Sequence, residues 1–287
     1  MKLKMYPNIK KIDENAIRIL DDGRIYVDYG PVSMVLQASR NNDIQTGLCL
    51  ESINIIPGLL KEISEAYEKL SLYPQEICLS DFNGLPFEMV KAVKGIEDPT
   101  LTSMAAVAGS VSDALADWLF KAGADKVIVN NGGDIAIRLS QNQSITLGIL
   151  PDINSGQLGK KIKICAEDGI GGVCTSGLGG RSLTRGIARS VTVMAKKCAI
   201  ADACATHLAN ASFIQSEAVK TSPAGIIYPG IDIADLSVVT EVGDLSDKEV
   251  RRSLNQIKEA AEIQYQLNNL LVVYADVCGY AMEWKKN

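Results

Sequence analysis

Three short stretches of this sequence combine polar side chains with glycines or helical spacing that could support chemistry. In Val127–Asp134, three β-branched apolar residues precede Asn-Asn-Gly-Gly-Asp. The apolar run predicts a buried strand, and Gly132 and Gly133 permit positive φ and the close approach of a ligand. Asn131 and Asp134 would then present an amide and a carboxylate to a ligand at the strand end. A tight hairpin into the next apolar run explains the same pattern, because Asn-Gly is a strong hairpin signal.

The second stretch is Thr175–Ser182, in a region where seven glycines fall within eighteen residues. Consecutive backbone N–H groups in such a turn can form an anion-binding nest, with hydroxyl and guanidinium groups adding donors. The spacing differs from the dinucleotide-binding fingerprint. A flexible surface loop is the alternative. If the stretch binds a phosphate or pyrophosphate, the candidate residues are Thr175, Ser176, Gly177, Arg181 and Ser182.

The third candidate is the pair Asp202 and Thr206, on a predicted Ala-rich helix over Cys198–Ala211. Residues four apart share one helix face, so a carboxylate and a hydroxyl could bind one cation. Oxygen ligands favour Mg²⁺, completed by water, backbone carbonyls and ligand phosphate. Alternatively, Thr206 bonds its own i−4 carbonyl and Asp202 pairs with a neighbouring cation. The single histidine, His207, projects about 140° away from Asp202, so we predict that it is packed or hydrogen-bonded outside this site.

Composition narrows the class of protein. The chain has 287 residues, 47% hydrophobic and 22% charged, which permits a sizeable core and excludes wholesale disorder. A net charge of −5 without a basic block, and only 5% aromatic residues, argue against nucleic acid as a partner. With no apolar run of membrane-spanning length and no signal-like N-terminus, we expect a cytoplasmic protein without membrane contact. Seven scattered cysteines predict reduced, buried thiols instead of disulfides or a zinc site.

The elements that must position these stretches follow from apolar periodicity. Residues 16–39 predict an antiparallel strand–turn–strand meander. Helical spacing predicts helices from about Pro57 to Leu70, around Phe87–Val93, over Met104–Ala122 and over Lys248–Leu267. Residues 151–160 read as a loop. Strands are predicted at Lys126–Asn130, Asp134–Leu139, Ser144–Ile149, Ile162–Ala166, Ser190–Ala195, Ser237–Val242 and Leu270–Ala275. We therefore expect one α+β domain over residues 1–287, with mixed or antiparallel sheets packed on Ala-rich helices.

The sequence also contains an internal echo. Thr102–Ala105, followed by Asp113, resembles Thr192–Ala195, followed by Asp202, with spacings that differ by one residue. Two similar strand–helix halves facing a shared site would explain it. Ala-rich helices also resemble one another by chance, so this internal similarity is compatible with a structural duplication but does not require one.

Taken together and in this order, the three stretches resemble the ApbE family of FAD:protein FMN transferases. That family's Gly-Gly-Asp turn is similar to residues 127–134, and its Thr-Ser-Gly…Arg segment to residues 175–181. Its Ser-Val-Thr-Val strand, followed by an Ala-Asp-Ala helix with Thr four places after the Asp, is similar to residues 190–206. The resemblance covers about residues 100–210. The whole-chain pattern, including residues 22–26 and 30–31, looks like the shorter UPF0280 branch.

The resemblance implies a duplicated α+β fold (ApbE-like, T-fold-like), a site for FAD or FMN, and Mg²⁺ held by Asp202, Thr206 and a backbone carbonyl near Ala108. It makes Asp202 the catalytic residue, acting through the metal. Residues 131–134 would position the flavin or ribose, and residues 175–182 the phosphates. This sequence differs from the family's pattern in two places. Ala108 replaces the family's lysine, and the family's insertion carrying His-Ile-Ile-Asp-Pro has no counterpart between Arg181 and Ser190.

The sequence thus leaves three functions open. The first is a flavin-nucleotide-binding protein that transfers FMN to a flavoprotein acceptor, or cleaves the FAD pyrophosphate, with Mg²⁺. The second is a non-catalytic flavin carrier or assembly partner, and the third is an enzyme using another phosphate-bearing small molecule in the same cleft. The apolar C-terminal segment and Ala-rich helices would tolerate a homodimer. All three functions require the three stretches to converge on one cavity.

Overall fold

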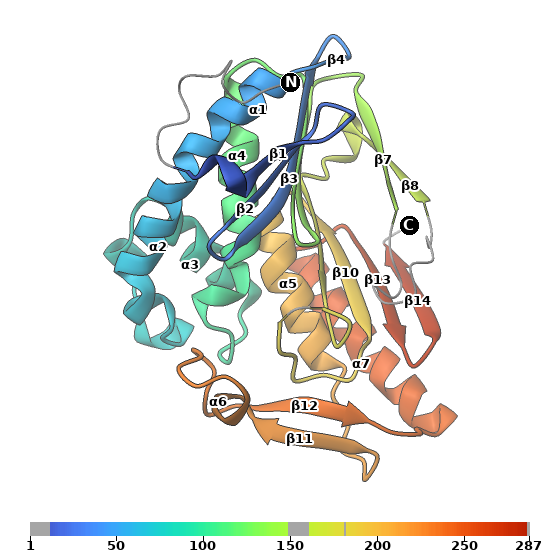
Figure 1. Cartoon of the computed structure of the whole chain (residues 1–287). Helices are drawn as coiled ribbons and strands as arrows, with labels where there is room; N and C mark the ends of the chain where they lie inside the picture. Colours follow the sequence, from blue (N-terminus) through green and yellow to red (C-terminus); the bar gives the residue numbers. More distant parts are fainter. Residues whose placement is uncertain (1–11, 149–160, 181, 286–287) are drawn as a thin grey trace.

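The computed structural model describes residues 12–148, 161–180 and 182–285. Within these ranges ten strands form one sheet in which every neighbouring pair is antiparallel, ordered β1-β2-β3-β5-β6-β9-β10-β13-β14 with β4 paired to β3 (Figure 1). The strands are β1 Ile17–Ile19, β2 Ile25–Tyr29, β3 Val32–Arg40, β4 Asp43–Ile44, β5 Lys126–Asn131, β6 Asp134–Leu139, β9 Gly172–Ser176, β10 Ser190–Ala195, β13 Val272–Val277 and β14 Tyr280–Lys285. The predicted α+β class is confirmed, with an antiparallel sheet.

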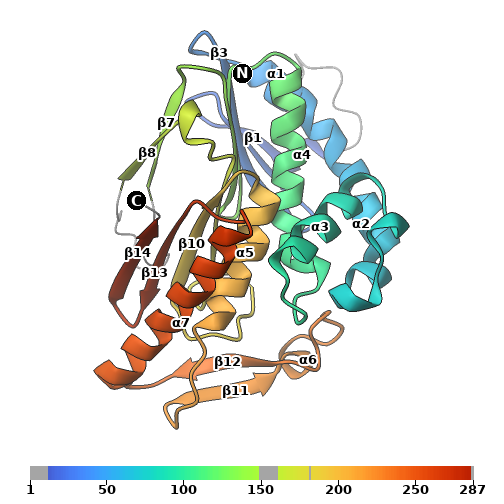
Figure 2. The same ribbon diagram turned by 180° about the vertical axis from the view of Figure 1, so that it is seen from behind.

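Helices cover one face of this sheet, as Figure 2 shows from behind. The helices on this face are α1 Thr46–Ser52, α2 Ile56–Leu70, α3 Gly84–Ile96, α4 Val107–Lys121, α5 Cys198–Ala211 and α7 Asp247–Gln266, whereas the short helix α6 Ala224–Ile227 lies beside β11. The main apolar core lies between them and the sheet. Helix α5 is central, contacting β9, β10, α3, α4 and α7. Glycine on the strand side allows the close contact with β9, since a Cβ on Gly172 would lie only 2.3 Å from the Cα of Cys198.

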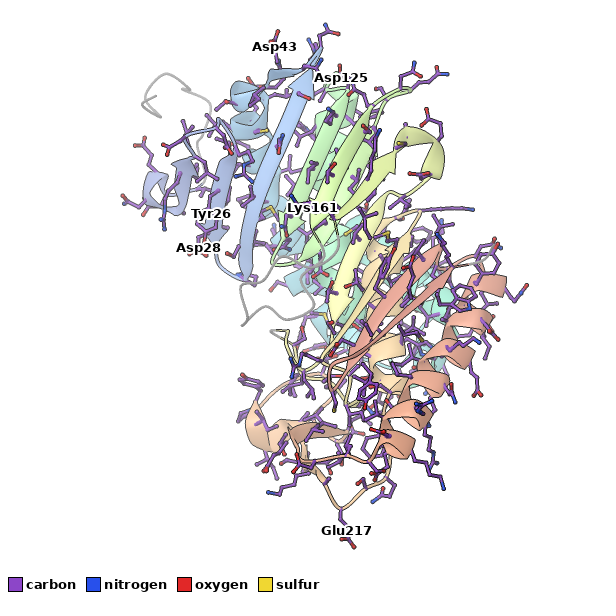
Figure 3. The ribbon with its side chains drawn as sticks, turned by 90° about the vertical axis from the view of Figure 1, so that its right-hand side faces the viewer. Tyr26, Asp28, Asp43, Asp125, Lys161 and Glu217 are labelled. Carbon is purple, nitrogen blue, oxygen red and sulfur yellow. The ribbon has the colours of Figure 1, made fainter. Side chains whose placement is uncertain are left out.

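Two further antiparallel hairpins lie outside the main sheet. The hairpin of β7 Ser144–Gly148 and β8 Lys161–Cys165 contributes to a second apolar cluster that includes Ile137, Val173 and Met194. The hairpin of β11 Val219–Pro223 and β12 Ser237–Val242 encloses α6 and lies at the end of the molecule marked by Glu217, opposite Asp43 and Asp125 (Figure 3). The predicted loop over residues 151–160 falls outside the described residues.

Most predicted elements are present, with corrections at their limits. The β1–β3 meander is confirmed, and α2 begins with Pro57 in its first turn as expected. Helix α3 is longer than predicted, and a 3-10 turn over Ser103–Ala106 precedes α4. Six elements were not predicted from the sequence: β4, α1, β9, β11, α6 and β14. The cysteine prediction was only partly right: all seven are free and four are buried, but Cys78 and Cys278 are exposed.

Helices α4 and α5 meet directly at their first turns. A Cβ on Gly109 would lie 2.5 Å from the carbonyl oxygen of Cys198, so this contact requires glycine. The Asp113 carboxylate accepts the N–H of Ala199 at 2.9 Å, and the Asp202 carboxylate accepts the N–H of Gly109 at 2.9 Å. Each helix therefore supplies a carboxylate to an N–H group that has no partner within the other helix.

The expected internal duplication is not confirmed. The aspartates of the two echoing segments do make these reciprocal contacts. However, Thr192–Ala195 lies in strand β10, whereas Thr102–Ala105 runs into the 3-10 turn before α4. The two segments therefore differ in backbone conformation where the echo begins.

Candidate functional site

Two adjoining cavities bring the predicted stretches together. The first, which we call the polar cavity, has a volume of about 230 Å³ and is lined by Pro31, Ala108, Asn131, Gly132, Gly133, Asp134, Thr175, Ser176, Gly177, Gly180, Ser182, Asp202 and Thr206. It contains every predicted site residue except Arg181, which lies outside the described residues. The second, which we call the apolar cavity, has a volume of about 330 Å³. The two share Ala108, Asp134, Ser182, Asp202 and Thr206, which we call the shared wall.

The Asn-Gly-Gly-Asp turn is both a hairpin and a wall of the polar cavity. Strands β5 and β6 pair up to Asn131 and Asp134, leaving Gly132 and Gly133 as a two-residue turn with φ of 67° and 117°. The Asn130 side chain accepts the N–H of Gly133 at 2.9 Å and closes the turn. The two interpretations of the sequence are therefore compatible, since the hairpin holds Asp134 at the cavity.

The glycine-rich stretch is built differently from the predicted anion nest. The N–H groups of Leu178, Gly179 and Gly180 donate to carbonyls of Ala188, Arg189 and Gly177, at 2.9 to 3.0 Å. These three N–H groups are thus not available to an anion, so an anion nest would have to be built without them. Gly177 is required because its φ is 133° and a Cβ there would lie 2.7 Å from the Arg189 carbonyl oxygen.

Hydroxyl-bearing residues of the same stretch line the polar cavity. Ser176 and Ser182 line it, and Thr175 lines it from the end of β9. The Thr175 hydroxyl also hydrogen-bonds that of Thr192 across the strand pair, at 2.7 Å. Donors to a ligand in this part of the site would therefore be side-chain hydroxyls more than backbone N–H groups.

Helix α5 presents Asp202 and Thr206 to both cavities, as the four-residue spacing predicted. Asp202 accepts the Gly109 N–H, and neither it nor Asp134 forms an ion pair with a described residue. Thr206 makes no hydrogen bond to its i−4 carbonyl in the described structure. Both structural alternatives for this pair are therefore absent.

The electrostatics of the shared wall disfavour two negative charges without a cation. Burial raises the pKa of Asp134 to about 6, and hydrogen bonds from the Cys174 thiol and the Thr175 N–H offset part of that effect. Burial also raises the pKa of Asp202 well above its usual value, and repulsion from Asp134 adds to the increase. A bound cation would favour the ionised forms of both groups.

The donor atoms at the shared wall fit a hard cation. The Asp202 carboxylate accepts the Gly109 N–H at 2.9 Å, the Thr206 hydroxyl lies one turn further along α5, and the Ala108 carbonyl accepts the Ser112 hydroxyl at 3.0 Å. All three are oxygen ligands, the type preferred by Mg²⁺. In the described part of the chain, no group of three or more His, Cys, Asp or Glu side chains is placed to hold a metal. Water and ligand oxygens would have to complete the coordination.

A buried ion-pair network supports the site from behind. Arg138 on β6 pairs with Asp113 at 2.8 Å and with Asp117 at 2.6 Å. Burial raises the pKa of Asp113, and Arg138 counteracts this by favouring the ionised carboxylate. Because Asp113 accepts the Ala199 N–H, the network fixes the first turn of α5 and hence the position of Asp202.

The apolar cavity contains residues that the sequence analysis missed. They include Thr100, Thr102, Arg185, Asn210, Tyr228 and Asp232. Asn210 was predictable in principle, because it continues the i, i+4 series Asp202–Thr206 along α5. The others come from segments without a recognisable motif. His207 lines neither cavity and its Nδ1 lies 2.7 Å from the Asp98 carboxylate, which confirms the prediction of a hydrogen-bonded histidine.

Comparisons with known proteins agree with this architecture. The family model described as AbpE bacteria matches residues 17–279. A UPF0280 protein of Methanobrevibacter smithii is 40% identical over 124 residues, 42% of this chain and 50% of the relative. A UPF0280 protein of Methanosarcina acetivorans is 35% identical over 164 residues, 56% of this chain and 61% of the relative. The chain thus spans about half to three fifths of the length of these two relatives.

A longer match is to a UPF0280 protein of Methanococcoides burtonii, 34% identical over 179 residues, 61% of this chain and 72% of the relative. Among solved structures, the flavin transferase ApbE from Vibrio cholerae matches with a TM-score of 0.46 and 13% identity, over 92% of this chain and 96% of that one. That likeness is too distant to support a conclusion. No helix in the described ranges is long and apolar enough to cross a membrane. The chain belongs to the AbpE bacteria family, as an ApbE-like protein of the UPF0280 group.

Proposed function

We propose that this protein binds a flavin nucleotide, FAD first, together with Mg²⁺ at the shared wall. One observation carries the proposal: two carboxylates with no cationic partner among the described residues, a hydroxyl and a carbonyl lie where two cavities meet. A pyrophosphate bridged by Mg²⁺ fits this junction, because it carries an organic group on each side. The cavity volumes of about 230 and 330 Å³ together lie within the usual range of small-molecule sites.

In this proposal the chain's own residues bind and orient the ligand. Asp202, Thr206 and the Ala108 carbonyl would hold Mg²⁺, which supplies neutralisation of phosphate charge when bound. The hydroxyls of Thr175, Ser176 and Ser182 would donate to phosphate oxygens, with Arg181 assigned the same role by motif resemblance. The turn residues Asn131, Gly132, Gly133 and Asp134 would position the flavin or ribose.

The reaction that such a site supports is transfer at the pyrophosphate. A hydroxyl oxygen of a flavoprotein acceptor, or of water, would attack the phosphorus of the FMN half. The bond from that phosphorus to the bridging oxygen breaks, AMP leaves with the oxygen, and the hydroxyl proton is released. The Gly109 N–H, by holding one oxygen of Asp202, keeps the carboxylate oriented toward the cavities during this step.

A non-catalytic flavin carrier is the second candidate function. The observation that favours it is the absence of a histidine from the lining of either described cavity, since His207 is bound to Asp98. The short connection between Arg181 and Ser190 also lacks the histidine-bearing insertion of the transferases. Binding would then proceed without release of AMP.

Titration calorimetry with FAD, with and without Mg²⁺, combined with an assay for AMP release, tests both functions. We expect Mg²⁺-dependent FAD binding that Asp202→Asn weakens at least tenfold, a loss of ~1.4 kcal/mol or more. Asp43→Asn changes an exposed carboxylate on β4 that lines neither cavity; it is the matched control and should bind as the wild type does. Binding without AMP release supports the carrier. No FAD binding with or without Mg²⁺ contradicts the flavin proposal and favours another phosphate-bearing ligand.

A further inference from the structure

The apolar cavity is lined by a guanidinium group that has no carboxylate partner among the residues that the structure describes. Arg185 lies in the connection between β9 and β10, is half-buried, and lines this cavity. Its Nη1 donates to the Thr100 hydroxyl oxygen at 2.8 Å, and its backbone N–H donates to the Asn210 side chain at 3.0 Å. Within the described residues its side chain forms no ion pair and uses no other donor. Most of its five N–H groups are therefore available.

The position of this guanidinium is fixed by a chain of hydrogen bonds. The Asp98 carboxylate accepts the Thr100 N–H at 2.9 Å and the Thr100 hydroxyl at 2.7 Å, and lies 2.7 Å from His207 Nδ1. Burial alone would raise the pKa of Asp98, but these hydrogen bonds hold it at about 2, so the group is ionised at neutral pH. Because the Thr100 hydroxyl donates to Asp98, its free lone pair must face Arg185.

The surroundings make an unpaired charge costly. Leu101, Met104, Val107, Leu183, Ile233 and Leu236 supply apolar walls. Asp232 also lines the cavity, but its carboxylate accepts the Thr102 hydroxyl. A charged group next to apolar walls loses part of its hydration, so the interaction with a ligand of opposite charge is more favourable there than in water. Guanidinium groups bind phosphates and carboxylates with paired N–H donors.

We propose that Arg185 binds an anionic substituent, a phosphate or carboxylate, on the organic part of the ligand that occupies the apolar cavity. This inference rests on the proposed function, since it assumes that the pyrophosphate lies at the shared wall. It makes Arg185 a specificity-determining residue: ligands with a second anionic group bind more tightly than the corresponding dinucleotide or diphosphate alone.

Calorimetric titration with matched probes tests this in the presence of Mg²⁺. The probes are ADP and the two forms of ADP that carry an additional phosphate on the ribose 2′ or 3′ oxygen. We expect the wild-type protein to bind at least one of these forms with an affinity at least tenfold higher than its affinity for ADP. Arg185→Gln should abolish that gain and change the affinity for ADP itself less than threefold. Arg185→Lys, which retains the charge but not the paired donors, should keep part of the gain.

Arg252→Gln is the matched control, because Arg252 is exposed on α7 and lines neither cavity. It should leave the gain unchanged. The assignment of Arg185 is overturned if neither phosphorylated form binds more tightly than ADP, or if the tighter binding persists in Arg185→Gln. In either case the proposed function still stands if ADP binding depends on Mg²⁺ and on Asp202. ADP binding that is indifferent to Mg²⁺ and to Asp202→Asn contradicts the proposed function, and with it the placement on which this inference depends.

Discussion

Asp134 and Asp202 bring two carboxylates with raised pKa values to one wall of the candidate site. Each carboxylate is partly buried, faces the same shared wall and has no cationic partner among the described residues. Their raised pKa values mean that the folded state holds protons that the unfolded state releases. A divalent cation removes the same unfavourable charge without a proton.

At the residue scale we therefore predict the pH dependence of stability. The folded pKa of Asp134 is about 6, above its unfolded value near 4, so its stabilising effect is present at pH 4 and is lost as pH rises to 6. In EDTA, the free energy of unfolding of Asp134→Asn relative to wild type should rise over this range, by about 1.4 kcal/mol for each unit of pKa shift. Urea unfolding between pH 4.5 and 7.5 measures it.

Two observations complete this test. Mg²⁺ added at pH 7.5 should stabilise wild type and should stabilise Asp202→Asn much less. Asp98, whose pKa is lowered to about 2, affects stability in the opposite direction: its stabilising contribution is lost as the pH falls. That loss occurs only below pH 4, outside the range from pH 4.5 to 7.5 that is measured. A difference between Asp134→Asn and wild type that stays constant from pH 4.5 to 7.5 would contradict the assignment.

At the scale of elements, the contact between α4 and α5 positions the site. Gly109 allows the helices to approach, and the reciprocal hydrogen bonds of Asp113 and Asp202 hold their first turns. Helix α5 is thereby placed so that Asp202 and Thr206 reach both cavities. A change in the distance between these helices should alter stability and binding together.

Gly109→Ala tests this coupling. Its new Cβ would lie 2.5 Å from the Cys198 carbonyl oxygen, so we expect a loss of about 1–3 kcal/mol of stability and at least tenfold weaker Mg²⁺-dependent FAD binding. Gly58→Ala on α2 is the matched control, since nothing lies within 4 Å of its new Cβ. It should be neutral or stabilise by about 0.4–1 kcal/mol, with unchanged binding. Equal effects of the two substitutions would show that the helix contact does not matter.

At the scale of the whole molecule, residues 228–236 connect distant parts of the chain around the apolar cavity. The Tyr73 hydroxyl donates to Asp235 at 3.1 Å, the Tyr67 hydroxyl to the Gly230 carbonyl at 3.3 Å, and Thr102 to Asp232. This segment lies between α6 and β12, at the end of the molecule seen at the bottom of Figure 1. A ligand in the cavity would contact it together with α4 and α5.

Hydrogen exchange detected by mass spectrometry measures this contact. FAD with Mg²⁺ should slow amide exchange several-fold in residues 228–236, because Ile231, Asp232 and Ile233 line the apolar cavity. The β7–β8 hairpin, which packs on the second apolar cluster, provides an internal control and should exchange at an unchanged rate. The same additions to Asp202→Asn should leave residues 228–236 unprotected. Protection confined to the hairpin would place the ligand elsewhere.

The amino-acid sequence by itself determined features that depend on neighbours along the chain. Apolar spacing located α5 and α7 nearly to the residue, and alternation located the β1–β3 meander. The Asn-Gly-Gly-Asp turn and the pair Asp202 and Thr206 were predictable for the same reason, since a turn or one helix face is set by a few consecutive residues.

Only the tertiary structure decided which polar groups lie together at the site and which of them already form hydrogen bonds within the protein. The N–H groups of Leu178 and Gly179 donate to carbonyls of Ala188 and Arg189 in the next segment, so they cannot take part in the predicted anion nest. Strand β9 formed within a glycine-rich run because β10 pairs with it. Arg185 belongs to no motif and lies at the apolar cavity only because Thr100 and Asn210, far away in sequence, hold it there. Such contacts depend on packing between distant segments, which periodicity and local propensity do not encode.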